Sequence, residues 1–220
     1  MSPRRRGSGR STRSPRAPRK ARREGRKRLP TRAAPAMLFR HVDSRFPFLW
    51  ESADQPPARW HGEGEGPVHS FADTPDGAWA ELLRHEEISE EADLATIRRS
   101  LWAVEVDVAG LPEPGLPNAV LCGGVESYAR CRDEARRLRA TGAVGLIAPS
   151  AALHGGEARG WRVEGGLRPG RPRSARVIAL FGRRPDLVGW SAAAEGRPHR
   201  SLLGKVRHLA APAKPRFRSG

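Results

Sequence analysis

The sequence has few cysteines, few aromatic residues and no long apolar run. Its 220 residues include two cysteines, Cys122 and Cys131, which are too few for a disulfide framework or a four-ligand zinc site. No stretch approaches the roughly 18 consecutive apolar residues of a membrane-spanning helix. The N-terminus also lacks the apolar segment that a secretory signal needs. We therefore expect a cytoplasmic protein with no membrane partner and no bound metal.

Acidic residues are scarce in only one part of the chain. The whole sequence has 40 Lys and Arg residues against 24 Asp and Glu residues, a net charge of +16. Residues 1–36 hold 14 of the basic residues and one acid, Glu24, whereas residues 37–220 hold 26 basic and 23 acidic residues. The first segment therefore carries a net charge of +13 and the remainder only +3.

Residues 1–36 are predicted to be a disordered basic tail, because charge and proline dominate and no apolar residue recurs with a period. The prolines would also interrupt the amphipathic helix of a transit peptide. Such a tail can bind nucleic acid weakly and without sequence preference, although it has no aromatic residue for base stacking. The alternative is a solvated extension without a role, or one that is not translated, since Met37 would serve as a start.

Residues 37–210 are predicted to form one domain with a proper core, followed by a flexible tail at 211–220. Apolar periodicity and capping residues predict two longer helices and a short basic helix near the end of the chain. Strands and helices are mixed along the chain without a βαβ rhythm, which favours an α+β fold. The predicted helices cover 76–87, 128–140 and 201–209, the strands 67–71, 100–108, 144–148 and 176–181, and the loops 51–66, 110–124 and 154–175.

No phosphate-binding glycine loop, zinc-binding histidine motif or nucleophile elbow is present. What remains is a set of polar residues at the edges of apolar elements: Arg40, Arg59, Glu81 and Ser150. Glu81 lies off the apolar stripe of its helix, one turn after Gly77, so its carboxylate stands beside small side chains. Two guanidinium groups with one carboxylate suit a nucleotide, whose diphosphate and ribose hydroxyls they match. A structural ion pair is the alternative, because the chain holds 36 arginines.

The order of several short motifs resembles the RES domain family. Arg-Trp-His-Gly at 59–62, Gly-Pro-Val-His-Ser-Phe at 66–71 and Ala-Trp-Ala-Glu at 78–81 follow the pattern of that family. The resemblance covers residues 37–210 and matches the family's anchor residues to Arg40, Arg59, Glu81 and Ser150. Two positions depart from it: His61 replaces an Asn, and Ser70 replaces a Tyr, while the chain's single tyrosine, Tyr128, lies elsewhere in the sequence.

The resemblance implies a fold similar to that of the ADP-ribosyltransferases, with a cleft that binds NAD⁺. Members of the family cleave the nicotinamide–ribose bond with phosphate or water as the acceptor, or transfer ADP-ribose to a protein. They include bacterial toxins encoded beside antitoxins. We therefore expect an enzyme that consumes NAD⁺ as its substrate, uses no prosthetic group and has an antitoxin as its partner.

The resemblance also implies a role for each anchor residue. Glu81 would stabilise the oxocarbenium-like ribose of the transition state. Arg40 and Arg59 would hold the diphosphate or an incoming phosphate, Ser150 would orient the acceptor or the nicotinamide side, and Ser70 would bind the substrate. The expected catalytic residues are Glu81, Arg59 and Ser150. Two other functions stay open: an ADP-ribosyltransferase acting on a protein, and a non-catalytic module that binds a nucleotide or nucleic acid.

Overall fold

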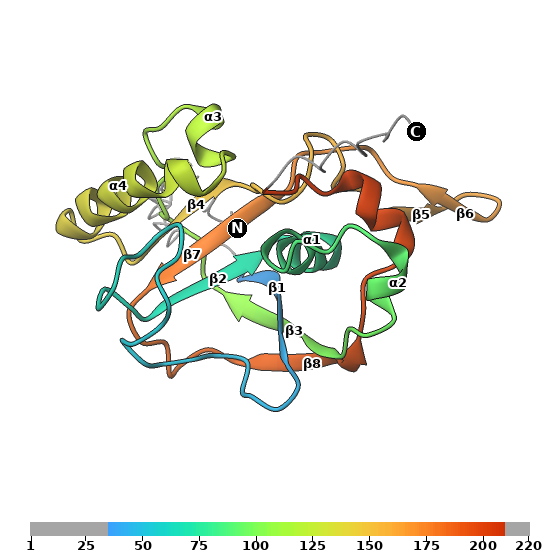
Figure 1. The fold of residues 1–220 in the computed structure, drawn as a ribbon, viewed down its shortest axis with the longest axis horizontal. Coiled ribbons are helices and arrows are strands. Elements are labelled where there is room, and N and C mark those ends of the chain that lie inside the picture. Colours follow the sequence, from blue (N-terminus) through green and yellow to red (C-terminus); the bar gives the residue numbers. More distant parts are fainter. Residues whose placement is uncertain (1–34, 210–220) are drawn as a thin grey trace, which may run out of the picture. The chain divides into compact units, whose positions relative to one another are not determined.

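A six-stranded sheet with helices packed against it forms the fold (Figure 1). The computed structural model describes residues 35–209. All neighbouring strands are antiparallel, in the order β4-β7-β2-β1-β3-β8, so the predicted α+β class is confirmed. The predicted tails at 1–36 and 211–220 lie outside the described residues, except for residues 35 and 36. The strands are β1 (Ala36–Asp43), β2 (Val68–Ala72), β3 (Arg99–Val106), β4 (Gly145–Pro149), β7 (Arg176–Phe181) and β8 (Gly189–Gly196).

Helix α1 (Pro75–His85) packs against β1 and β2. Its start is fixed by Thr74, whose hydroxyl accepts a hydrogen bond from the backbone N–H of Gly77 at 2.9 Å, and by Pro75 in the first turn. Trp79, Leu82 and Leu83 face the core, as the apolar spacing predicts. The helix thereby holds Glu81 at the border between the core and the surface.

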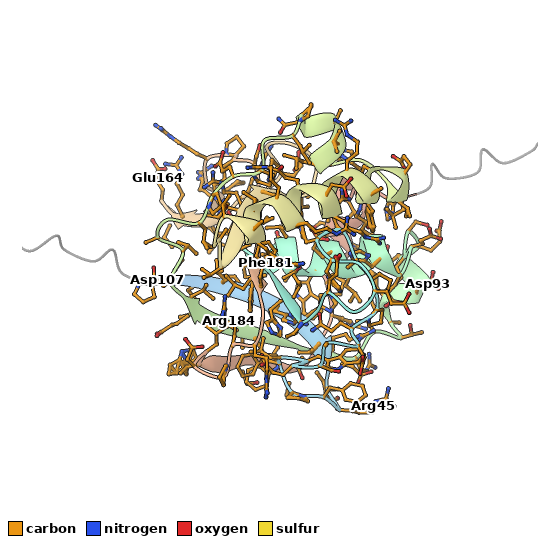
Figure 2. All side chains as sticks on the ribbon, turned by 90° about the vertical axis from the view of Figure 1, so that its left-hand side faces the viewer. Arg45, Asp93, Asp107, Glu164, Phe181 and Arg184 are labelled. Atoms are coloured by element: carbon orange, nitrogen blue, oxygen red, sulfur yellow. The ribbon has the colours of Figure 1, made fainter. Side chains whose placement is uncertain are left out.

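Helix α4 (Tyr128–Ala140) covers β4 and β7, and Figure 2 shows it above the end of β7 at Phe181. The predicted bounds of 128–140 are confirmed. Cys131, Ala135 and Leu138 are buried in the same cluster as Phe181. Gly142, just past the helix end, has φ +84°, a conformation that favours glycine.

Two regions predicted as loops contain regular structure. Residues 154–175 hold a hairpin of β5 (Trp161–Val163) and β6 (Leu167–Pro169) that extends away from the sheet (Figure 1). Residues 110–124 hold the short helix α3 (Asn118–Leu121), and the 3₁₀ helix η1 (Val125–Ser127) follows. The other short helices are α2 (Glu91–Leu94) and the 3₁₀ helix η2 (Arg200–Lys205). The strands and the helix in these two regions are short, and the regions are rich in Gly, Pro or Arg. Neither sequence therefore shows a clear apolar period.

Within residues 35–209, no helix has the length and the apolar character needed to cross a membrane.

Candidate functional site

The predicted site residues meet around a cavity of about 230 Å³ between α1, the strands β1 and β2, and the start of α4. Arg40 comes from β1, Ser70 from β2, Arg59 from the loop between them and Glu81 from α1. Ser150 follows β4 and reaches the cavity through its contact with Glu81. The chain folds so that five predicted residues from five separate segments come together, four of them lining the cavity and Ser150 bonded to Glu81. Other polar or aromatic residues of the cavity wall are His41, Trp60, His61, Phe71, Arg84, His85 and Tyr128.

Glu81 is the one carboxylate in the cavity wall, and two side chains hold it. The hydroxyl of Ser150 donates to its Oε1 at 3.3 Å, and Nε2 of His85 lies 3.6 Å from its Oε2. Ser150 is itself fixed, because its hydroxyl accepts hydrogen bonds from the backbone N–H groups of Ala152 and Leu153. The structure therefore brings the two predicted site residues Glu81 and Ser150 into contact. His85 was missed, although its spacing of four residues from Glu81 signals a contact on one helix face.

Arg40 brings an uncompensated positive charge to the cavity. Its guanidinium group lies 6.0 Å from the centre of the Phe71 ring. It has no ion pair with any residue of the described chain. Burial lowers the pKa of Arg40 to about 10, because a charged group is less well solvated away from water. An anion in the cavity would supply the missing counter-charge.

Arg59 lines the same cavity but is already anchored. Its Nη1 donates to the hydroxyl of Ser127 at 3.1 Å and to the carbonyl of Val120 at 3.3 Å, and its Nη2 donates to the carbonyl of Gly123 at 2.8 Å. The guanidinium group also lies 4.6 Å from the centre of the Tyr128 ring. Since an arginine has five N–H donors, Arg59 presents a fixed charge with two donors left for a ligand.

Arg84 is a third guanidinium group in the cavity wall, and the sequence did not reveal it. The residue is only 2% exposed. It donates to the carbonyls of Ala151 at 2.9 Å, of Gly123 at 2.7 Å and of Arg207. Burial lowers the pKa of Arg84. An arginine is so rarely buried without an acidic partner that sequence patterns favour an exposed position for it.

Tyr128 places an aromatic ring in the cavity although the sequence has Ser70 at the position where the family has Tyr. It is the first residue of α4 and is 9% exposed. The residue lies far from Ser70 along the chain, but both residues line the same cavity. The place of Tyr128 elsewhere in the sequence therefore does not keep its ring out of the cavity.

The cavity wall is strongly positive. Three guanidinium groups, those of Arg40, Arg59 and Arg84, face one carboxylate, that of Glu81. None of the three arginines forms an ion pair with another residue of the described chain. A ligand with about two negative charges would balance the wall. Within residues 35–209, no group of three His, Cys, Asp or Glu residues is placed to hold a metal ion.

The family model of the RES domain matches residues 32–200, which include all five predicted site residues. The chain belongs to the RES domain family. This RES domain also has the fold of a chain in the crystal structure of the M. tuberculosis MbcT–MbcA toxin–antitoxin complex. The TM-score is 0.50 at 17% sequence identity, over 77% of this chain and 87% of that chain. No curated protein matches this RES domain.

Proposed function

We propose that this RES domain binds NAD⁺ in the cavity around Glu81 and cleaves the bond between nicotinamide and ribose. The observation that carries the proposal is the charge arrangement, in which one fixed carboxylate lies among three arginines without counter-ions. A dinucleotide matches this arrangement, because it has two negative charges on its diphosphate and develops a positive charge on one ribose during cleavage. The expected similarity to the ADP-ribosyltransferase fold belongs to the same proposal.

The residues divide the chemistry between them. Arg40 and the free donors of Arg59 bind the diphosphate, since guanidinium groups match phosphate oxygens. The carbon–nitrogen bond then breaks and its electron pair leaves with nicotinamide, which needs no proton to depart. The carboxylate of Glu81 stabilises the cationic ribose and accepts hydrogen bonds from the ribose hydroxyls. An oxygen of phosphate or water forms the new bond to the same ribose carbon, and an attacking water loses a proton to solvent.

The direct test is to follow NAD⁺ with the purified full chain, with and without inorganic phosphate, and to identify the products. We expect NAD⁺ to disappear and free nicotinamide to appear in equal amount. ADP-ribose 1-phosphate as the second product would identify phosphate as the acceptor, and ADP-ribose would identify water. Binding of NAD⁺ without turnover would instead favour the nucleotide-binding module. The absence of both NAD⁺ binding and NAD⁺ turnover would contradict the proposal.

Tyr128 is expected to supply the aromatic contact that Ser70 cannot make. Replacing Tyr128 with Leu should raise the KM for NAD⁺ by about threefold to tenfold, because the ring lines the cavity and also lies against Arg59. The variant Tyr128→Phe is the matched control, since it keeps the ring and removes only the hydroxyl. Steady-state kinetics on both variants check this. An equal rise in the KM of both variants would assign the effect to the hydroxyl instead.

We also propose that a protein partner regulates the cavity. The support is that the similar fold was found in a toxin–antitoxin complex. A positive cavity with one carboxylate would accept an acidic segment of such a partner. Addition of the product of the neighbouring reading frame should then slow NAD⁺ loss, and a saturating NAD⁺ concentration should weaken the inhibition. Unchanged NAD⁺ loss at a large excess of that protein would exclude it as the partner.

A further inference from the structure

A second cavity, of about 450 Å³, adjoins the first one at Pro149, which lines both. Its volume falls within the range of small-molecule sites. Ser150 and Leu153 form buried parts of its wall, whereas Asn118 and His154 lie at the exposed rim. The polar side chains that line it belong to Asn118, Cys122, Ser150, His154, Ser174 and Arg207.

Arg207 is held at this cavity by its backbone. The segment that carries it pairs with residues 152–154 through a bridge between Leu153 and Val206. The backbone N–H of Arg207 donates to the carbonyl of Ala152 at 2.7 Å, and its carbonyl accepts from Arg84. The backbone of Arg207 is therefore held by contacts that do not involve its guanidinium group.

The guanidinium group of Arg207 has an unmet hydrogen-bonding need. Its Nη1 is buried and has no hydrogen-bond partner. A buried donor without an acceptor is unfavourable, and native proteins rarely leave one in place without a reason. Nη1 itself is out of reach of a ligand, but the Arg207 side chain lines an open cavity. A ligand there can accept hydrogen bonds from the other N–H groups of the guanidinium, which form none within the described residues.

The rest of the wall shows which kind of ligand fits. The other side chains offer an amide, two hydroxyls, an imidazole and a thiol, and no Asp or Glu of the described chain lines the cavity. A site with a guanidinium group, several further donors and no carboxylate selects an oxyanion. We propose that the second cavity binds a small molecule with a phosphate or carboxylate group, which accepts hydrogen bonds from Arg207.

This anion site adjoins the NAD⁺ site that we propose and shares Pro149 and Ser150 with it, but the proposal does not depend on NAD⁺ cleavage. Arg207 and Ser174 line the second cavity, whereas Arg40, Arg59 and Glu81 line the first. The binding test contains no NAD⁺, so its result is independent of whether the chain cleaves NAD⁺.

The test is an NMR titration of the ¹⁵N-labelled full chain with inorganic phosphate and, separately, with succinate. We expect saturable shifts of the backbone amides of Asn118, His154 and Ser174. The stronger of the two probes identifies a phosphate or a carboxylate as the natural group. Because inorganic phosphate can also enter the first cavity, the titration is repeated with Arg40→Gln, in which these three shifts are expected to persist.

Arg207→Gln should weaken the binding at least tenfold. This variant is a clean probe, because the backbone contacts of Arg207 to Ala152 and Arg84 remain. Arg200→Gln is the matched control: Arg200 belongs to η2, is exposed and pairs with Glu91 at 3.4 Å. It should bind like the unmodified chain. Shifts that survive Arg207→Gln, shifts confined to the first cavity, or no shifts with either probe would each overturn the proposal.

Discussion

Replacing Glu81 with glutamine is expected to slow NAD⁺ cleavage at least about a hundredfold, the range found when a single transition-state contact is removed. Glutamine has nearly the same shape and can still accept the hydrogen bond from Ser150, so the cavity should keep its form. What the variant loses is the negative charge beside the developing cation. Because Glu81 is the only carboxylate that residues 35–209 contribute to the cavity wall, no neighbouring group among them can take over that role.

The measurement is the initial rate of nicotinamide release by the full chain and by Glu81→Gln at saturating NAD⁺. Glu86→Gln is the matched control, since Glu86 follows α1, is exposed and contacts Arg99 at 3.5 Å away from the cavity. The control should retain the full rate, and circular dichroism should show both variants folded. A Glu81→Gln protein that releases nicotinamide at the normal rate would remove this residue from the mechanism.

Arg84→Met is expected to lower the free energy of unfolding by about 3 kcal/mol or more. Methionine fills similar space but donates no hydrogen bond, so the carbonyls of Ala151 and Arg207 lose their donor, while that of Gly123 keeps only its bond from Arg59. Each buried group left without a partner is unfavourable by about 1–3 kcal/mol. The loss of an interior guanidinium group also removes one of the three positive charges around the cavity.

Urea unfolding of the full chain, followed by tryptophan fluorescence, measures this effect. Arg98→Met is the control, because Arg98 is exposed and donates only to the nearby carbonyls of Ala95 and Ile97. Arg84→Lys should recover only part of the stability, since a single ammonium group cannot reach three separate carbonyls with the geometry of a guanidinium fork. Equal stability of Arg84→Met and Arg98→Met would show that Arg84 does not hold the three segments together.

The sequence predicted best those elements whose ends carry a local signal. Thr74 and Pro75 mark the start of α1, and Gly142 marks the end of α4. The place of Glu81 off the apolar stripe also followed from helical spacing alone. β7 was predicted with its observed bounds, because a continuous apolar run in a central strand differs clearly from the surrounding loops.

Other parts of the fold and site depend on contacts between distant residues. Strand β8 carries small residues and lies at the edge of the sheet, so its sequence lacks the alternation of apolar and polar residues that would predict a strand. Tyr128 reaches the cavity only because α4 begins beside Arg59. The role of Arg84 depends on three carbonyls from three other segments, and no local pattern encodes such a meeting.

The carbonyl of Gly123 accepts from both Arg59 and Arg84, and Arg84 reaches on to the carbonyl of Arg207. These hydrogen bonds link the wall of the first cavity to the backbone of Arg207, which lies 148 positions after Arg59 in the sequence. Contacts this far apart in sequence form late, because the loops between them must be ordered first. During synthesis on the ribosome, residues 35–200 would already be made while Arg84 still lacked its last acceptor. The order of translation therefore delays completion of the site until nearly the whole chain has emerged.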